Sequence, residues 1–375
     1  MLSSARPLLI VSVLSACLCS ISLAAPEPIE PLPLGSKAPA FSLPGADGRT
    51  WTLEDFSDTG LLVIVFTTNH CPTAQAYEER IKQLTADYAG RGVAVVAISP
   101  NDPRAVRLDE LGYTDLSDSF PEMVLRARQH GFNFPYLYDG DSQEVSKAYG
   151  PQATPHVFIF DSDRRLRYSG RIDNNEKPEL VTSRDARAAI DALLAGEDPP
   201  LAVTKTFGCS VKWASKRGSV QDAFERWAAE EVAVSPADLA TVGELLANDS
   251  GKYRLVNIWA TWCGPCVVEF PNLVEINRMY RNRPFELVTI SADSPAGTSS
   301  VLDFLRGQQA SCTNYHYTGE DKYALIEAVD PEWPGSLPYT LLVAPGGEVL
   351  RRWSGQIEPQ VVKTAVVEKL GRYYE

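Results

Sequence analysis

The chain has 375 residues, and its 48 Asp and Glu against 35 Lys and Arg leave a formal net charge of −13 at pH 7. This acidic balance argues against nucleic acid and anionic membrane surfaces as partners, because binding to phosphates requires a basic face. The length predicts two or three domains, and the hydrophobic content of 44% is that of an ordinary globular protein.

The N-terminus has the pattern of an export signal over residues 1–25. Arg6 is its only charge, and the apolar run that follows is too short to span a bilayer. Two cleavage sites compete. Leu23-Ala24-Ala25 supplies small residues suited to an ordinary signal peptidase, whereas Leu14-Ser15-Ala16-Cys17 resembles a bacterial lipobox and would leave a lipid on Cys17. We therefore expect a protein of the bacterial periplasm or cell envelope, whose only attachment to a membrane, in the lipobox alternative, is that lipid on Cys17.

Residues 26–34 are rich in proline and follow as an extended tether. Beyond the signal the chain has five cysteines, which are Cys71, Cys209, Cys263, Cys266 and Cys312. An odd number in an exported protein implies at least one free or transiently paired thiol. The odd number suits a redox protein better than a small fold cross-linked by structural disulfides.

The first half, residues 35–215, alternates strands and helices. A continuous apolar run, Leu61–Phe66, predicts a buried central strand. Asn69-His70-Cys71-Pro72 follows it, then a helical pattern through residue 88 and a second buried strand, Val93–Ile98. An insertion from Pro100 to Tyr136 includes a predicted helix near Phe120–His130. The pattern then predicts a strand at 135–138, a helix at Ser142–Tyr149, a strand at Val157–Phe160, its hairpin partner Leu166–Gly170 and a closing helix, Asp185–Leu194.

The second half repeats this order after a linker helix within residues 216–234. We expect a helix to begin with Ser235 as N-cap and Pro236 in its first turn. The apolar run Tyr253–Ala260 then predicts a strand that leads into Trp262-Cys263-Gly264-Pro265-Cys266 and a helix to about residue 281. The remaining expected elements are a strand at Phe285–Ser291, helices at Ala296–Gln308 and Lys322–Val329, a hairpin of 339–343 with Val349–Trp353, and a closing helix, Val361–Leu370.

The two halves align without a gap around their cysteines. Phe66-Thr67-Thr68-Asn69-His70-Cys71 lies over Ile258-Trp259-Ala260-Thr261-Trp262-Cys263. Cys71 then matches Cys263, and Ala74 matches Cys266. The pattern therefore indicates two divergent copies of one fold, over residues 35–215 and 235–375, of which the first has a single motif cysteine.

Two cysteines separated by two residues at a strand-to-helix junction suit dithiol–disulfide exchange. Cys263 is expected at the helix N-terminus, where unpaired N–H groups and the helix dipole favour a thiolate. Cys266, one turn later, can attack a mixed disulfide formed on Cys263. The alternative is half of a zinc site, but only Cys312 and His316 lie downstream, at a poor spacing for further ligands. We expect redox chemistry, no metal, and no cofactor beyond the redox-active disulfide Cys263–Cys266.

Trp262-Cys263-Gly264-Pro265-Cys266 resembles the thioredoxin active site, and the continuation Val267-Val268-Glu269-Phe270-Pro271 resembles the extracytoplasmic TlpA and ResA group. The likeness covers roughly residues 235–375 and implies a thioredoxin fold, with Cys263 as nucleophile and Cys266 as resolving thiol. In that group a glutamate at the place of Glu269 tunes the cysteines. The alternative is an exposed helix charge. Trp262 is expected to pack over the site, or else simply to fill the core.

The first half resembles redoxin and peroxiredoxin domains. Residues 35–43 fit their opening pattern Gly-x-x-Ala-Pro-x-Phe-x-Leu, and Thr68-x-x-Cys71-Pro72 echoes the motif in which a threonine orients peroxide. The proline expected seven residues before the cysteine is Ile64 here. The neighbouring His70 either stabilises a Cys71 thiolate or merely caps the turn.

Phe207–Trp213 resembles the C-terminal tail of redoxin-like proteins that carry Asn-His-Cys-Pro at the active site. Cys209 is then a possible resolving partner for Cys71, or alternatively a buried structural thiol. Arg171 is a candidate charge near this site, or a solvated arginine.

Thr154-Pro155 and Leu337-Pro338 each precede a strand and a hairpin, as the cis-proline of the thioredoxin fold does. In that fold the bond holds the preceding backbone beside the active-site cysteine, where it can pair with a substrate strand. Thr154, Pro155, Leu337 and Pro338, together with Trp262, are therefore the expected substrate-binding positions.

These resemblances imply an α/β protein of two tandem thioredoxin-fold domains, each a central mixed sheet flanked by helices. The expected enzyme is a thiol-disulfide oxidoreductase whose second domain reduces protein disulfides, with electrons from an unidentified membrane or periplasmic donor. The first domain is expected to be a thiol peroxidase, or alternatively a non-catalytic module that binds a partner or peptide. A corollary is that Cys263 and Cys266 reduce an oxidised Cys71 in the same chain.

Overall fold

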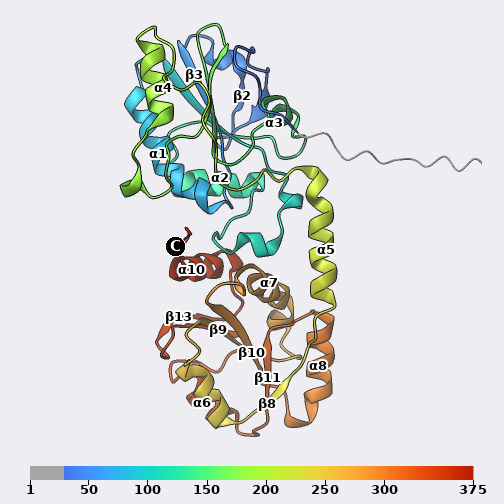
Figure 1. Cartoon of the computed structure of the whole chain (residues 1–375). Helices are drawn as coiled ribbons and strands as arrows, with labels where there is room; N and C mark the ends of the chain where they lie inside the picture. The colour runs from blue at the N-terminus through green and yellow to red at the C-terminus, as the bar shows by residue number, and fades with distance from the viewer. Residues whose placement is uncertain (1–28, 375) are drawn as a thin grey trace, which may run out of the picture.

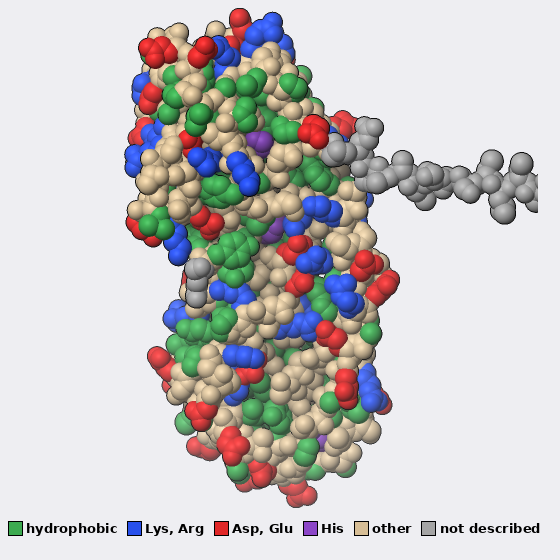
Figure 2. Space-filling view, in the orientation of Figure 1, with side chains coloured by type: hydrophobic (Ala, Val, Ile, Leu, Met, Phe, Trp, Pro, Cys, Tyr) green, Lys and Arg blue, Asp and Glu red, His purple; other side chains and the backbone are tan. Residues whose placement is uncertain are grey.

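The computed structural model describes residues 29–374, so the export signal, Cys17 and the start of the tether lie outside the described residues. Figure 1 shows two α/β units, one above the other, joined along one side by helix α5 (Arg217–Ala228). Among the described residues no helix is both long and apolar enough to cross a bilayer. Figure 2 shows acidic and basic side chains interspersed over one face of both units.

The first unit is built on a five-stranded mixed sheet in the order β5-β4-β3-β6-β7. Its central strand β3 is buried along its whole length, runs parallel to β4 and runs antiparallel to β6. A small antiparallel pair, β1 with β2, precedes the sheet. The strands are β1 (Ser42–Pro44), β2 (Thr50–Thr52), β3 (Leu61–Phe66), β4 (Val93–Ser99), β5 (Tyr136–Tyr138), β6 (His156–Phe160) and β7 (Leu166–Gly170). The helices are α1 (Pro72–Tyr88), α2 (Phe120–Gln129), α3 (Glu144–Tyr149) and α4 (Asp185–Leu194).

The second unit has a six-stranded mixed sheet in the order β13-β12-β9-β10-β11-β8. Its central strand β9 runs parallel to β10 and antiparallel to β12. The strands are β8 (Ser235–Ala237), β9 (Tyr253–Trp259), β10 (Phe285–Ser291), β11 (Thr313–Tyr317), β12 (Tyr339–Val343) and β13 (Val349–Ser354). The helices are α6 (Leu239–Ala247), α7 (Gly264–Tyr280), α8 (Thr298–Gly307), α9 (Lys322–Val329) and α10 (Pro359–Leu370).

Both units share one scaffold. In each, the central strand leads to a cysteine that N-caps a helix of 17 residues, α1 after Cys71 and α7 after Cys263. Each central strand has parallel neighbours on one side and an antiparallel hairpin on the other, β6–β7 or β12–β13. The predicted fold class, an α/β protein with two mixed sheets and equivalent cysteine junctions, is confirmed.

The start of the second unit corrects the sequence prediction. Ser235–Ala237 is not the first turn of a helix but the edge strand β8, paired in parallel with β11. Helix α6 begins only at Leu239, where the Asp238 side chain accepts a hydrogen bond from the Thr241 N–H at 2.8 Å. Pro236 is tolerated in β8 because an edge strand has a row of N–H positions that need no partner. The prediction failed because β11 was not recognised, so nothing marked these residues as its neighbour.

The two units meet through the insertion that follows β4. Val106 and Leu111, from this insertion, are buried in the apolar core formed mainly by the second unit. The Tyr280 hydroxyl, at the C-terminal end of α7, donates to the Thr114 carbonyl at 2.7 Å. Arg283 donates to the Gly112 carbonyl at 3.0 Å. The first unit is therefore docked on the C-terminal end of α7.

Candidate redox sites

The second unit places Cys263 at the N-terminus of α7. Its Sγ accepts a hydrogen bond from the Cys266 N–H at 3.3 Å, and Pro265 occupies the first turn, where a missing N–H costs nothing. The two sulfurs are joined in a disulfide. Reduction would leave a Cys263 thiolate facing the free N–H groups of the helix, which stabilise negative charge. The expected nucleophile and resolving thiol are thus brought together.

Glu269 lies one turn below Cys266 on α7 and is fully buried. One carboxylate oxygen accepts from Asn257 Nδ2 at 2.9 Å, and the other accepts from the Ile357 N–H at 2.8 Å. Burial raises the pKa of Glu269 to about 7, against the two hydrogen bonds that lower it. The alternative of an exposed helix charge is wrong, and the carboxyl is suited to exchanging a proton near neutral pH.

An open groove of about 620 Å³ borders Cys263. Trp262 lines it and is 70% exposed, so the alternative that this side chain fills the core is wrong. Leu337 also lines it, and the peptide bond between Leu337 and Pro338 is cis, as expected from the sequence. The groove is mostly apolar, with Lys322 as its single Lys or Arg, and it leaves the edge beside the cis-proline accessible.

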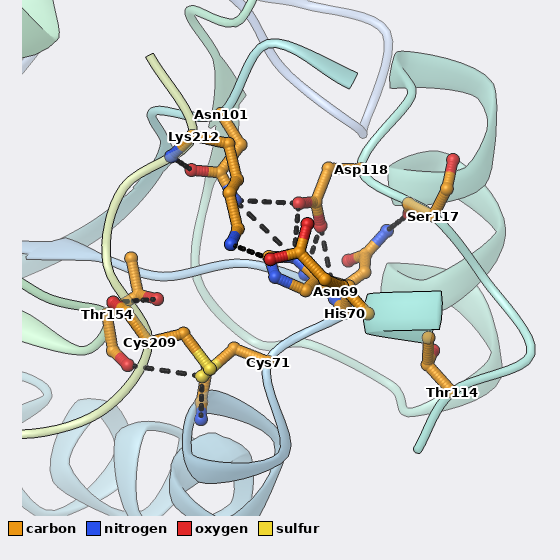
Figure 3. Close-up of polar contacts among 12 residues, drawn as sticks. Asn69, His70, Cys71, Asn101, Thr114, Ser117, Asp118, Thr154, Cys209 and Lys212 are labelled. Atoms are coloured by element: carbon orange, nitrogen blue, oxygen red, sulfur yellow. Dashed lines mark hydrogen bonds and ion pairs between the residues drawn. The ribbon is translucent and has the colours of Figure 1, made fainter. Parts of the chain in front are cut away.

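The first unit places Cys71 at the N-terminus of α1. Its Sγ accepts a hydrogen bond from the Ala74 N–H at 3.4 Å, which repeats the geometry of Cys263. Ala74 offers no second sulfur. Instead, the Cys209 thiol, from the tail that follows α4, lies beside Cys71, whose own thiol donates to the Thr154 carbonyl at 3.4 Å. Figure 3 shows the two sulfurs facing each other, so the structure brings together the pair that the sequence left open.

The tail lies along the edge beside the first cis-proline. Thr154, whose bond to Pro155 is cis, pairs antiparallel with Cys209, and the Thr154 N–H donates to the Cys209 carbonyl at 2.9 Å. Gly208 has a φ of +124°, and a Cβ there would lie 2.2 Å from the Thr154 carbonyl oxygen. Only glycine lets the tail approach this closely. The expected peptide-binding edge is therefore occupied by the chain itself.

A buried acid–histidine pair stands next to Cys71. His70 Nδ1 lies 2.5 Å from Asp118 Oδ2, and Asn101 donates to the same carboxylate oxygen at 2.7 Å. Burial lowers the pKa of His70, but the charge of Asp118 and its hydrogen bond outweigh burial and raise that pKa. The raised pKa favours the charged imidazole beside the Cys71 thiol, which agrees with the expectation that His70 stabilises a thiolate (Figure 3).

These contacts decide which sulfur is the anion. Burial raises the pKa of the Cys71 thiol, but the contact with Cys209, the charge of His70 and the Ala74 N–H together lower it to about 6. Contact with Cys71, together with burial, raises the pKa of Cys209. Cys71 is therefore the more acidic of the two thiols, which is the division of roles that an attacking and a resolving cysteine need.

The other residues singled out in the sequence have the following surroundings. Arg171 pairs with Asp185 at 2.7 Å, at the start of α4. Cys312 donates to Asn314 Oδ1 at 3.2 Å, within the second unit. The Thr68 hydroxyl is buried and has no hydrogen-bond partner in the described part of the chain. Sequence reasoning missed Asp118, which sits in the insertion after β4, where no motif marks it.

The two cysteine pairs are far apart in this arrangement. Cys263 begins α7, whereas the first unit docks on the other end of that helix, at Tyr280. The 17 residues of α7 span about 25 Å at a rise of 1.5 Å per residue. The corollary that Cys263 and Cys266 reduce Cys71 directly therefore requires another chain or a reorientation of the two units.

The chain is similar to several known proteins. It is 32% identical over 105 residues to the thiol-disulfide oxidoreductase ResA of Oceanobacillus iheyensis, which covers 28% of this chain and 50% of that protein. It is 29% identical over 139 residues to a Mycobacterium tuberculosis protein that carries the provisional name peroxiredoxin MT2597, covering 33% of this chain and 88% of that protein. The chain spans about half the length of the ResA proteins it matches.

A solved structure of a hypothetical protein, SMc02350 from Sinorhizobium meliloti, is 38% identical, with a TM-score of 0.44, and the match covers 50% of this chain and 97% of that one. The sequence profile of the AhpC/TSA family matches two regions, residues 34–169 and 226–369, one in each unit. These regions hold both cysteine junctions and make up well over half of the chain. The chain belongs to the AhpC/TSA family, and it carries two units of that kind in tandem.

Proposed function

We propose that the second unit is a thiol-disulfide oxidoreductase that reduces protein disulfides. The observation that carries this proposal is the Cys263–Cys266 pair at a helix N-terminus, beside an open and mostly apolar groove. A groove of this kind admits a polypeptide segment, and the free edge at Leu337 offers it a backbone to pair with. The name of the relative ResA agrees with this activity.

In the proposed reaction the Cys263 thiolate attacks one sulfur of a substrate disulfide. A mixed disulfide forms and the other substrate sulfur leaves as a thiolate. Cys266 then loses its proton, attacks Cys263, and releases the second substrate thiol, so that the substrate is reduced and Cys263–Cys266 is oxidised. Glu269, with a pKa near 7, is the proposed group that exchanges the proton with Cys266. An unidentified membrane or periplasmic donor would restore the dithiol.

For the first unit we propose reduction of a peroxide at Cys71. The Cys71 thiolate attacks one peroxide oxygen and becomes a sulfenic acid, and the other oxygen leaves as water or an alcohol. Cys209 then displaces the hydroxyl as water and forms a Cys71–Cys209 disulfide. The low pKa of Cys71, the adjacent Cys209 and the unpartnered hydroxyl of Thr68 support this assignment. The tail across Thr154 argues against a protein substrate here.

The proposed place of action is the bacterial periplasm or cell envelope. This proposal rests on the sequence of residues 1–25 and on the lipobox-like Cys17, which lie outside the described residues. Expression with and without residues 1–25, followed by fractionation of the cells, tests it. Retention of the full chain in the cytoplasm would contradict export.

The function of the second unit is tested by trapping. Cys266→Ser should hold mixed disulfides on Cys263 that a reductant releases, because the resolving sulfur is missing. The matched control is Cys312→Ser, which removes a thiol outside both sites. If Cys266→Ser traps no more protein than Cys312→Ser, the proposed reaction with protein disulfides is wrong.

The alternative for the first unit is a binding module without turnover. It predicts that Cys71→Ser consumes peroxide at the wild-type rate when a reductant is supplied. It also predicts that a partner binds at the edge of Thr154 after the tail has left. Peroxide-dependent loss of Cys71 and Cys209 thiols in wild type, absent in Cys71→Ser, would favour the peroxidase.

A further inference from the structure

One segment of the insertion after β4 is held by the second unit. Both carboxylate oxygens of the buried Asp115 accept hydrogen bonds from that unit, one from Arg372 at 2.6 Å and the other from Thr364 at 2.7 Å. The Tyr280 hydroxyl donates to the Thr114 carbonyl at 2.7 Å. Figure 1 shows α10, which carries Thr364, on the side of the second unit that faces the first. These contacts fix the segment from the second unit.

The same segment holds the histidine beside Cys71. Asp118, three residues after Asp115, accepts hydrogen bonds from the backbone N–H of Asn69 at 2.9 Å and of His70 at 3.1 Å. Its other carboxylate oxygen lies 2.5 Å from His70 Nδ1, and Figure 3 shows this carboxylate directed at the ring. One short stretch of chain therefore joins the second unit to the redox site of the first.

The stretch is compact, so its two ends move together. Residues 112–119 form neither a helix nor a strand. Between the two aspartates the chain is held in a tight turn, in which Thr114 Oγ1 donates to the Leu116 carbonyl at 2.9 Å and accepts from the Leu116 N–H at 3.0 Å. Both residues of this turn are fully buried. A displacement of Asp115 is thus passed on to Asp118.

Arg372 is the group that keeps a charged Asp115 in its place. The Asp115 side chain is 2% exposed, and Arg372 is the cation paired with it. A carboxylate buried without a partner is strongly disfavoured, and the loss of its cation drives it toward water. Without Arg372 the segment would therefore leave its present position.

The position of Asp118 in turn decides the charge beside the thiol. Burial lowers the pKa of His70, whereas the charge and the hydrogen bond of Asp118, with a smaller contribution from Cys71, raise it. Lys212 is the other charged group that acts on the imidazole, and it lowers that pKa. If Asp118 is displaced, burial favours the neutral imidazole, and the thiol loses the positive charge that stabilises its anion.

We propose that Arg372, in the second unit, is a positioning residue for the redox site of the first unit. By fixing Asp115 it holds the segment that presents Asp118 to His70. The charged imidazole then supports the Cys71 thiolate. The site of the first unit is thus complete only while the two units are docked. The proposal rests on the proposed redox role of Cys71, but it does not depend on a peroxide being the oxidant.

The pH profile of Cys71 alkylation tests this role. The reduced protein, prepared from residue 26 on, reacts with iodoacetamide over about pH 5–9, and mass spectrometry of the Cys71 peptide gives the rate. The midpoint of the profile is the readout. A change in exposure alone would alter the rate by the same factor at every pH, whereas loss of the neighbouring positive charge moves the midpoint.

Arg372→Met removes the cation and keeps a long unbranched side chain. It should move the midpoint up by roughly one pH unit from its wild-type place near pH 6, because the thiol becomes less acidic. Arg372→Lys can still pair with Asp115 and should restore most of the wild-type profile. The matched control is Arg352→Met, which breaks a 2.6 Å ion pair with the buried Asp330 inside the second unit and should leave the midpoint unchanged.

Two further variants test the route from Arg372 to the thiol. His70→Asn already lacks the imidazole, so adding Arg372→Met should shift the midpoint by less than about 0.3 pH unit, because both changes remove the same interaction. Tyr280→Phe keeps the buried ring and removes only the donor to the Thr114 carbonyl. It should shift the midpoint in the same direction but less, and it supplies the test if Arg372→Met does not fold.

An unchanged midpoint in both Arg372→Met and Tyr280→Phe would overturn the proposal. An equal shift in Arg352→Met would also overturn it, because the shift would then reflect a general loss of stability. A full additional shift in the His70→Asn background would do the same, because Arg372 would then act by another route. If the midpoint moves as predicted but the protein consumes no peroxide, the proposed peroxidase function fails while the role of Arg372 stands.

Discussion

The two units place a cysteine at the same point of the same scaffold but obtain the second sulfur in different ways. In the second unit the partner of Cys263 is Cys266, one turn along the helix. In the first unit the equivalent position is Ala74, and the partner Cys209 arrives from a tail that pairs with Thr154. The scaffold therefore fixes the place of the attacking sulfur but not the source of the resolving one.

The same difference decides what can reach each site. The edge at Leu337 is open and borders a groove, whereas the edge at Thr154 is filled by the tail. The residues before the two cysteines differ accordingly. Trp262 is exposed at the open site, and His70 is buried against Asp118 at the closed one. An open site suits a polypeptide substrate, and a closed site suits a small one.

The largest expected effect separates the two sites by activity. Cys263→Ser should abolish reduction of insulin disulfides and leave peroxide consumption unchanged, because the nucleophile of one site is lost. Cys71→Ser should do the reverse. Turbidity from reduced insulin and the loss of added peroxide measure the two activities. If either substitution removes both activities, the two sites do not work independently.

The next effect concerns the buried carboxyl below Cys266. The folded-state pKa of Glu269, about 7, lies above its unfolded value of about 4.5, so the folded protein binds the extra proton in that window. The stabilisation is present below pH 4.5 and is lost as pH rises to 7, by up to about 3 kcal/mol. Urea unfolding of wild type and Glu269→Gln across this range measures it, and the variant should lack the decline. Parallel pH profiles would contradict the assigned pKa.

A third change would make the closed site resemble the open one. Gly208→Ala places a Cβ against the Thr154 carbonyl, so the tail should move away at a cost of about 2 kcal/mol. Dipyridyl disulfide should then react with Cys71 to form a mixed disulfide and release one thiopyridone, without the second release that occurs when Cys209 attacks this mixed disulfide. Gly218→Ala is the control, because nothing lies within 4 Å of a Cβ at that position. An unchanged second release in Gly208→Ala would show that the tail does not need this glycine.

The smallest expected effect tests the charge beside Cys71. His70→Asn removes the imidazolium, so the pKa of Cys71 should rise from about 6 toward its usual range. At pH 7 the thiolate fraction, and with it the rate of alkylation by iodoacetamide, should fall roughly tenfold. Mass spectrometry of the Cys71 peptide follows the rate, with His130→Asn as a control. A midpoint of the pH profile that stays near 6 in His70→Asn would assign the low pKa to the hydrogen bonds alone.

The scaffold could be predicted from the sequence because its signals are local. Buried strands such as Leu61–Phe66 are continuous apolar runs, and the helices after Cys71 and Cys263 follow directly from them. The cis-prolines at 155 and 338 were identified by their place before a hairpin. Strand β8 was misread because its partner β11 lies far along the chain and has no apolar run.

The closed site could be predicted only in part. Cys209 was recognised as a candidate, but its pairing with Thr154 depends on a tail that returns across the sheet edge. Asp118 reaches the site from the insertion that follows β4. No spacing or periodicity links such distant residues, so only the folded chain reveals them.

The central claim, that the two units use the same cysteine position with different partners, is tested most directly by mapping disulfides. The protein is reduced, oxidised mildly with peroxide, blocked with an alkylating reagent and digested without reductant for mass spectrometry. The account predicts two intramolecular links, Cys71–Cys209 and Cys263–Cys266, with Cys312 recovered as an alkylated thiol. Recovery of Cys209 as an alkylated thiol while Cys71 is oxidised alone or linked to another cysteine would contradict it.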